Sequence, residues 1–330
     1  MKRKKGALPI AWTAAVLLGL AAGVAVLFLT HAGQAAEGLG QLLGYAVSSV
    51  GRLGAALRFA AVLMLLGLGC YVSASAGGTA LGVPGQFIAG AAAALLGAAL
   101  NQWGLCLLLG AAAGCAWGML PRLFRGHAAG AAVLLDWAAY FTADALLAGL
   151  PFQPGDKAAR LAAVHPGAMP PALGGSFVNA AVPVALACAA AVWFLIRSTT
   201  LGYEIRACAL NRQAAWNAGV RVNQRETLAA GLCGGLAGLA GGLFFLLDAS
   251  TYALSGALPS VAFYAVPSAL LGMAHPLAAV GSALVVAWLR SGQTALNKLI
   301  GQQDARLVAG AALYLGALAL LAWRGMRRGK

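Results

Sequence analysis

Long apolar runs, separated by short polar segments, decide the fold class of this chain. The first run, residues 8–30, contains no charged residue and exceeds the roughly 20 apolar residues that a helix needs to cross a bilayer. Only 9% of all residues are charged and the mean hydropathy is +0.83, whereas a soluble domain carries about 25% charged residues. The sequence therefore predicts an all-α, polytopic integral membrane protein of the cell membrane.

Counting the runs predicts about ten transmembrane helices in a single membrane domain, residues 1–330. The predicted spans are 8–30, 53–75, 86–100, 102–121, 129–149, 176–196, 227–248, 259–273, 277–294 and 306–323. With both termini in the cytoplasm, most of the 22 Lys and Arg residues fall on the cytoplasmic side, as the positive-inside rule requires. This topology makes 197–226 a cytoplasmic loop, and it makes 150–175, which contains several Pro and Gly residues, the longest external loop.

A short repeated motif favours two five-helix halves of inverted topology. Ala94-Leu-Leu-Gly97 and Ala269-Leu-Leu-Gly272 each end an apolar run just before another begins. In the predicted topology the two motifs face opposite sides of the membrane, as they do in transporters built from inverted repeats. A chance match in a chain so rich in Ala and Leu is the alternative.

Several kinds of site are disfavoured by what the sequence lacks. The net charge of +14 is spread between apolar runs without a continuous basic face, which argues against nucleic acid as a partner. The six cysteines form no CxxC pair and the four histidines lie apart, so we expect neither a metal site nor a cofactor. No nucleophile and base cluster together, and no GxxxxGKS or GxxxxGKT motif occurs, so we expect neither an enzyme nor an ATPase site in this chain.

The polar segment 197–226 has the features of a short surface helix. Asn211 is suited to cap a helix over Arg212–Ala218, and Gly219 is suited to end it. A helix of about seven residues is marginal alone in water, so it must pack on something. Its small residues are Ala214, Ala215 and Ala218, and the arginines around it are Arg206, Arg212, Arg221 and Arg225. The pattern favours a docking surface; an ordinary cation-rich cytoplasmic loop is the alternative.

A glycine-rich run follows this segment and predicts close helix packing. Its overlapping GxxxG pairs are Gly231 with Gly235, Gly234 with Gly238, and Gly238 with Gly242. In a membrane, such pairs let the backbones of two helices approach closely.

The two segments together carry a family pattern. Its residues are Thr200-Leu-Gly-Tyr-Glu-Ile-Arg-Ala207, Asn211, Ala214-Ala215, Ala218-Gly219-Val220 and the glycine-rich run. The pattern resembles the ABC-importer permeases of the branched-chain amino acid, ribose and nucleoside type, and within them the nucleoside and simple-sugar branch. In that family this loop is the cytoplasmic coupling segment that docks on the ATP-hydrolysing subunit. The resemblance implies coupling roles for Gly202, Glu204, Arg206, Ala207, Asn211, Ala214, Ala215, Ala218 and Gly219.

Further matches extend the resemblance from about Leu66 to Gly310. Gly82 with Gly85-Gln86 is similar to the family's Asn-Ile-Gly-x-Glu-Gly-Gln segment, Leu134-Leu-Asp-Trp137 to its Leu-Leu-Asn-Tyr, and Ala269-Leu-Leu-Gly272 with His275-Pro276 to its Ala-Leu-Leu-Gly motif and following Pro. The chain departs from the family at Ala80, Pro84, Asp136 and Ala128, where the family has Asn, Glu, Asn and Glu. The lost polar groups leave the substrate open: we expect nucleosides first and simple sugars next.

Five residues are predicted to line the substrate pathway: Gln86, Asp136, Trp137, Tyr140 and Phe141. The aromatic residues recur at helical spacing beside the carboxylate, and such a face can stack a base or a sugar ring. A carboxylate inside the membrane is costly and tends to face a cavity or a partner. The alternative is a helix-packing surface in which Asp136 pairs with Arg58 or Arg290.

The resemblance implies a permease subunit that moves a small polar solute and catalyses no covalent step. Its expected partners are ABC ATPase subunits, a second permease subunit (homologous or identical), an external substrate-binding protein and the lipid bilayer. Two other functions stay open. An ion-coupled secondary transporter would use Asp136 or Asp248 as its coupling carboxylate, and a degenerate permease would serve only as the structural partner of a second permease subunit.

Overall fold

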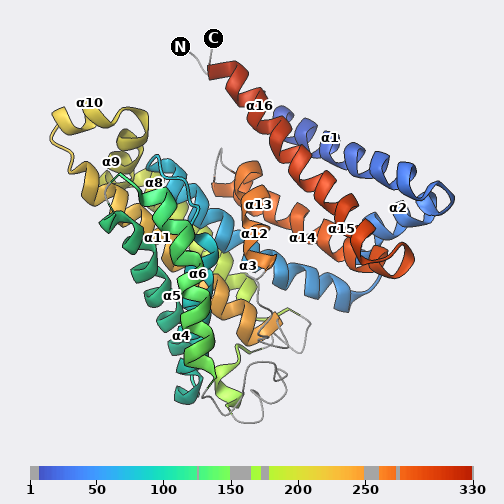
Figure 1. Ribbon diagram of the computed structural model, residues 1–330, viewed down its shortest axis with the longest axis horizontal. Helices are drawn as coiled ribbons and strands as arrows, with labels where there is room; N and C mark the ends of the chain where they lie inside the picture. The colour runs from blue at the N-terminus through green and yellow to red at the C-terminus, as the bar shows by residue number, and fades with distance from the viewer. Residues whose placement is uncertain are drawn as a thin grey trace.

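The computed structural model in Figure 1 describes residues 7–124, 126–148, 165–171, 178–248, 260–272 and 276–328. Within these ranges every regular element is a helix, and the longer helices are predominantly apolar. The predicted all-α, polytopic membrane fold is thereby confirmed. Most of the external loop predicted at 150–175 lies outside the described residues.

The described part of the chain contains longer helices, shorter helices and single turns. The longer helices are α1 (Ala7–Thr30), α3 (Val50–Ser75), α4 (Val83–Leu96), α5 (Trp103–Met119), α6 (Ala128–Leu147), α8 (Ala181–Ser198), α11 (Val222–Leu243), α14 (Pro276–Leu299) and α16 (Gly316–Arg328). The shorter ones are α2 (Ala35–Gly44), α9 (Thr200–Leu210), α10 (Arg212–Asn217), α12 (Ser260–Phe263), α13 (Ala265–Gly272) and α15 (Gln302–Gly310). Turns of 3-10 helix are η1 (Ala32–Gln34), η2 (Tyr45–Val47), η3 (Gly97–Leu100), η4 (Leu120–Leu123) and η5 (Pro166–Ala168), and π-helical stretches are η6 (Phe244–Asp248) and η7 (Ala311–Leu315).

Eight helices of the described part are long and apolar enough to cross a membrane, and they match eight of the ten predicted spans. The other two predictions, 259–273 and 277–294, correspond to a shorter apolar helix, Val261–Leu271, and to α14. Helix α14 has the necessary length, but its second half carries Arg290, Gln293 and other polar residues, which lower its hydropathy. The predicted number of ten spans is therefore not confirmed.

Helix α3 is the central helix of the fold. It packs on α8 and α11 of one group of helices and on α13 and α14 of another. In Figure 1 the first group contains α4, α5, α6, α8 and α11, and the second contains α1, α2, α13, α14, α15 and α16. Since both groups cover α3, nearly every residue from Phe59 to Val72 is buried, which explains why its apolar residues show no one-sided pattern.

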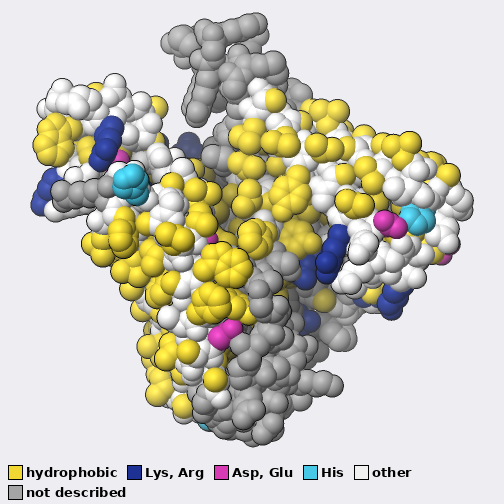
Figure 2. Space-filling view, in the orientation of Figure 1, with side chains coloured by type: hydrophobic (Ala, Val, Ile, Leu, Met, Phe, Trp, Pro, Cys, Tyr) yellow, Lys and Arg dark blue, Asp and Glu magenta, His cyan; other side chains and the backbone are white. Residues whose placement is uncertain are grey.

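The outer surface is largely apolar. In Figure 2 hydrophobic side chains cover much of the visible face of both groups of helices, and charged side chains form only small separate patches. Leu17, Leu108 and Leu134, on α1, α5 and α6, are each more than half exposed. Such a surface suits contact with lipid tails.

Helix α11 packs on α5 and α4 through glycine-to-glycine contacts. A Cβ on Gly238 would lie 2.9 Å from the Cα of Gly114 on α5, and a Cβ on Gly234 would lie 3.0 Å from the Cα of Gly118. Gly90 of α4 meets the backbone of Gly238 as well. Helix α5 thus presents its own glycines at four-residue spacing, a matching pattern that our sequence analysis missed.

The other predicted packing glycines are held less closely. A Cβ on Gly242 would lie 3.0 Å from the Cβ of Ala94, and Gly231 faces the side chains of Cys115 and Met119. The nearest atom to a Cβ on Gly235 would be 3.5 Å away, an ordinary van der Waals distance. Close approach is therefore concentrated at Gly234 and Gly238.

The helix contacts follow a crossed pattern. Helix α3 precedes α4 and α5 in the chain but also packs on α13 and α14, whereas α11 precedes α13 and α14 but packs on α4 and α5. The repeated motif lies at matching places, with Ala94–Gly97 at the end of α4 and Ala269–Gly272 at the end of α13. This pattern favours the inverted repeat, which stays a prediction.

Helix α2 lies in a stretch where we predicted no helix. It buries Ala35, Gly38 and Leu42 and packs on α14. The Trp288 indole Nε1 donates a hydrogen bond to the carbonyl oxygen of Leu43 at 3.0 Å. Helix α2 is short and amphipathic, so a search for long apolar runs does not find it.

Candidate functional site

The polar segment begins with a sharp turn between α8 and α9. Thr199 caps α9, since its Oγ1 accepts a hydrogen bond from the backbone N–H of Gly202 at 3.1 Å. A Cβ on Gly202 would lie 2.6 Å from the Cα of Ile196. Gly202 therefore allows α9 to fold back closely on the end of α8, and it contributes no exposed surface.

Helix α10 has the ends that the sequence predicted. The Asn211 Oδ1 accepts a hydrogen bond from the backbone N–H of Ala214 at 3.0 Å, and Gly219 follows the helix with a φ of 85°, which favours glycine. Ala215 is buried and packs with Cys208 and Val222. The predicted exposed face of small residues therefore contains Ala214 and Ala218 but not Ala215, which is buried and anchors α10.

Large apolar side chains protrude from this segment. Tyr203 and Leu210 of α9 are 67% and 87% exposed, and Trp216 of α10 is 62% exposed. Residues seven apart share one face of a helix, so Tyr203 and Leu210 lie on the same face of α9. Three such side chains in a charged segment indicate a contact surface. Sequence reasoning missed them because it weighted the charges; their apolar character in a polar stretch was the available signal.

Ion pairs hold the segment on the start of α11. Glu226 of α11 pairs with Arg212 Nε of α10 at 3.2 Å and with Arg122 Nη1 of η4 at 3.2 Å, and its side chain is only 14% exposed. Glu204 of α9 pairs with Arg225 of α11. The predicted ring of arginines is therefore partly neutralised, because Arg212 and Arg225 are paired.

Two further residues of the segment are fixed by local contacts. Arg206 Nε donates a hydrogen bond to the carbonyl oxygen of Gly202 at 3.2 Å. Ala207 packs against the small cluster around Cys208. Burial raises the pKa of the Cys208 thiol above its ordinary value of 9.0, and the negative charge of Glu226 raises it further.

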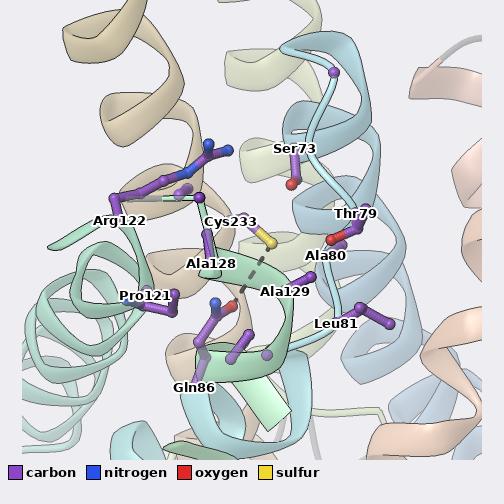
Figure 3. Close-up of a pocket in the computed structure, with 17 residues that line it drawn as sticks. Ser73, Thr79, Ala80, Leu81, Gln86, Pro121, Arg122, Ala128, Ala129 and Cys233 are labelled. Atoms are coloured by element: carbon purple, nitrogen blue, oxygen red, sulfur yellow. Dashed lines mark hydrogen bonds between the residues drawn. The ribbon is translucent and has the colours of Figure 1, made fainter. Parts of the chain in front are cut away.

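A polar cavity of about 280 Å³ lies beside these ion pairs, between the end of α3, the start of α4, α6 and α11. Figure 3 shows Gln86, Ser73, Thr79 and Arg122 around it, with Cys233 next to Gln86. The Gln86 Oε1 lies 3.6 Å from the Cys233 Sγ. Because Arg122 lines the cavity and also pairs with Glu226, the cavity is connected directly to the ion pair of α10.

A second, mainly apolar cavity of about 590 Å³ lies between α3, α4, α6, α12 and α13. Asp136 and Trp137 line it, and it shares the residues from Gly78 to Leu81 with the polar cavity. The Asp136 Oδ1 accepts a hydrogen bond from the backbone N–H of Gly85 at 2.7 Å. The Arg290 guanidinium, one of the partners considered for Asp136, instead lies 4.0 Å from the centre of the Phe59 ring.

The three predicted aromatic residues lie together, but only Trp137 lines one of the two cavities. Trp137 stacks on Phe141 with ring centres 6.3 Å apart, and Tyr140 meets both rings edge-on. Tyr140 is buried and Phe141 is 64% exposed, and neither lines the polar or the apolar cavity. The structure thus places Gln86, Asp136 and Trp137 at cavities and the other two beside them. The side chain of Asp248 lies outside the described residues.

Ala80 has an unusual backbone conformation at the junction of the two cavities. Its φ is 49°, in the left-handed region that Asn adopts more readily than Ala, and it lines both cavities. This is a position where the resembling family has Asn. Among the described residues, no group of three or more His, Cys, Asp or Glu is placed to hold a metal ion.

Comparison with known proteins gives one family and two relatives. The family "Branched-chain amino acid transport system / permease component" matches residues 52–317. The guanosine ABC transporter permease protein NupP of Bacillus subtilis (strain 168) is 28% identical over 296 residues, which is 86% of this chain and 84% of NupP. The nucleoside ABC transporter permease protein NupB of Lactococcus lactis subsp. cremoris (strain MG1363) is 27% identical over 144 residues, 43% of this chain and 40% of NupB. No solved structure matches the chain significantly.

The family match covers most of the chain, including α3 to α15 and the polar segment with α9 and α10. It agrees with the apolar helices and with the resemblance noted in the sequence. The chain therefore belongs to the family of branched-chain amino acid transport system permease components: it is a multi-pass permease subunit of the cell membrane, and not an enzyme.

Proposed function

We propose that the chain is the permease subunit of an ABC importer that carries nucleosides into the cell. One observation supports this most: Arg122 lines the polar cavity and pairs with Glu226, which also pairs with Arg212 of α10. A surface helix and a substrate-sized cavity are thus joined by a single carboxylate. A permease powered from outside its own chain needs such a connection.

The proposed docking site for the ATPase is the surface of α9 and α10, on the cytoplasmic side. Tyr203, Leu210 and Trp216 would bury their exposed apolar area in the partner, as aromatic anchors do at many interfaces. Asn211 and Gly219 set the ends of α10, and Ala215 anchors it. In this proposal Ala214 and Ala218 border the contact, and the remaining predicted coupling residues shape the segment.

The proposed complex contains two ATP-hydrolysing subunits, a second permease subunit (related or identical) and an external substrate-binding protein. When the ATPases close, they would move α10, and the Glu226 bridge would pass this movement to Arg122. Alternation between two arrangements of the cavity requires only that ATP binding favour one of them. Both termini lie on the cytoplasmic side in this proposal.

Nucleosides are the proposed cargo because both curated relatives are described as permeases for guanosine or nucleosides. Trp137 offers an aromatic ring for stacking, while Asp136 and Gln86 offer hydrogen-bonding groups. A simple sugar would use the same hydrogen-bonding groups and would not need the aromatic ring of Trp137.

Uptake by the reconstituted complex tests this function. The tagged chain, extracted in a gentle detergent, should co-purify with an ATPase and a substrate-binding protein, and proteoliposomes should take up radiolabelled guanosine only with ATP inside. An uncoupler should leave uptake unchanged. Failure to recover any ATPase, or uptake that an uncoupler abolishes and that survives without ATP, would contradict the proposal. The second result would favour an ion-coupled transporter.

A substitution at Asp136 tests the pathway within the same assay. Asp136→Asn keeps an oxygen that can accept from the Gly85 N–H, so the fold should persist. If Asp136 contacts the cargo, the concentration for half-maximal uptake should change. Unchanged uptake and unchanged substrate preference would remove Asp136 from the pathway.

A further inference from the structure

The polar cavity contains a buried hydroxyl group that no protein group satisfies. Ser73, in the last turn of α3, lines this cavity and is only 5% exposed. Within the described residues its Oγ makes no hydrogen bond, although packing does not seal it, and in Figure 3 it points into the cavity. Buried polar atoms nearly always have a hydrogen-bond partner. The Ser73 hydroxyl is therefore suited to a partner that enters the cavity.

The Arg122 guanidinium reaches the same part of the wall. A Cβ on Gly78 would lie 2.6 Å from the Ser73 Oγ and 3.3 Å from the Arg122 Nη2, so the two atoms flank one point. A side chain on Gly78 would occupy the space between them, and glycine leaves it free. Glu226 holds only Nη1 of the guanidinium, at 3.2 Å. Because an arginine has five N–H donors and no acceptor, its Nη2 side still offers donors to a ligand.

Two further polar side chains complete the wall. Thr79 lines the cavity, and its hydroxyl makes no hydrogen bond within the part of the chain that the structure describes. Gln86 lines the cavity as well and is 5% exposed. A hydroxyl both donates and accepts, and an amide has one group of each kind whichever way it is turned. No Asp or Glu is among the described residues of the wall.

Neutral hydroxyl groups match this wall better than charged groups do. A ligand hydroxyl can accept from Arg122 and donate to the oxygen of Ser73 or Thr79. An ammonium group would be repelled by the guanidinium, and a phosphate would bring further negative charge near Glu226, which already pairs with Arg122. The cavity of about 280 Å³ is smaller than the roughly 300–1,000 Å³ of a pocket for a drug-sized ligand. It therefore suits the sugar of a nucleoside more than the whole molecule.

We propose that the polar cavity is a subsite for the 2′- and 3′-hydroxyl groups of ribose, and that Ser73 and Arg122 distinguish ribonucleosides from deoxynucleosides. Proteins use the same property of the 2′-hydroxyl, which both donates and accepts, to tell RNA from DNA. The inference rests on the proposed nucleoside transport for the identity of the cargo. It adds which part of the cargo the permease recognises.

Competition in equilibrium dialysis tests the subsite, with radiolabelled guanosine and the full chain in nanodiscs. 2′,3′-Dideoxyguanosine lacks both hydroxyl groups and should displace guanosine at least about tenfold less well than unlabelled guanosine does, the effect of losing one hydrogen bond to a charged group. Inorganic phosphate should not displace guanosine. Equal displacement by the dideoxynucleoside would overturn the inference, and displacement by phosphate would do so too, because it would indicate an anion site.

Two serine variants on one helix show whether Ser73 carries this preference. Ser73→Ala should reduce the preference for guanosine over 2′,3′-dideoxyguanosine at least about threefold, since one hydrogen bond is lost, and should leave the affinity for the dideoxynucleoside unchanged. Ser75→Ala is the matched control, because Ser75 lies outside the cavity and its Oγ donates to the Tyr71 carbonyl oxygen at 2.7 Å. Both affinities come from one preparation, so their ratio does not depend on the folded fraction. An undiminished preference in Ser73→Ala would overturn the inference.

The subsite and the proposed transport can fail separately. ATP-driven guanosine uptake by the complex, together with a permease that binds both nucleosides equally, would leave the transport function and remove the subsite. Binding that depends on the ribose hydroxyl groups, without ATP-driven uptake, would contradict the transport function and leave the subsite in place.

Discussion

Replacing Gly238 by alanine is the sharpest test of how α11 is packed. The added Cβ would lie 2.9 Å from the Cα of Gly114 and also against the backbone carbonyl oxygen of Gly110. Carbon atoms in contact are separated by about 3.5–4.0 Å, so α5 and α11 would have to part by at least about 0.6 Å. Backbone atoms cannot rotate out of the way as a side chain can.

The cost follows from the contacts that such a gap weakens. A gap of about 0.5–1 Å loses a quarter to a half of each dispersion contact, and overpacking of this kind typically costs about 1–3 kcal/mol. Helix α11 cannot shift toward α4 instead, because Gly90 already meets Gly238 from that helix. We therefore expect Gly238→Ala to lower the unfolding temperature by on the order of 5 °C.

Gly235→Ala is the matched control on the same helix. Its Cβ would find its nearest neighbour at 3.5 Å, an ordinary contact, and alanine favours a helix over glycine by about 1 kcal/mol. Both variants are compared with the unchanged chain by thermal unfolding in detergent, followed by tryptophan fluorescence. If Gly238→Ala unfolds at the same temperature as Gly235→Ala or at a higher one, the packing argument is refuted.

Three further predictions concern the segment of α9 and α10. Glu226→Gln should speed hydrogen exchange of the α10 amides about tenfold and leave α14 unchanged, since both ion pairs of Glu226 are lost; equal exchange would contradict the bridge. Trp216→Ala should weaken ATPase binding at least about tenfold, because a buried aromatic anchor typically contributes about 2 kcal/mol or more. Trp193→Ala on α8 is the control and should leave ATPase binding unchanged. Surface binding assays with the purified ATPase compare the two variants. In a chain whose other cysteines are replaced, alkylation of Cys208 should reach half its maximal rate above pH 9.0, since burial raises its pKa. Glu226→Gln should move that midpoint to lower pH, because removing a negative charge stabilises the thiolate, and a midpoint that stays or rises would count against the assignment.

Features set by neighbouring residues were predictable from the sequence. Asn211 and Gly219 mark the ends of α10 through local backbone geometry, so their residue types are informative alone. The glycines of α11 show their packing through their spacing. The apolar runs predict the membrane helices because lipid requires such runs in any sequence.

Features that depend on residues far apart in the chain were not predictable from the sequence. Arg122 and Glu226 are 104 positions apart, so no spacing rule connects them. The burial of Ala215 depends on Val222 folding back onto α10. Likewise, the polar residues of α14 gain meaning only when α12 and α15 close a cavity around them.

The Glu226 bridge has a thermodynamic consequence for the order of events in transport. If docking of the ATPase on α10 changes the affinity of the polar cavity for its ligand, a ligand in that cavity must change the affinity of the ATPase by the same factor. The permease with bound ligand would then bind the ATPase with a different affinity from the empty permease. Through its ion pairs with Arg122 and Arg212, the Glu226 carboxylate would let ligand binding in the polar cavity change the affinity of α10 for the ATPase.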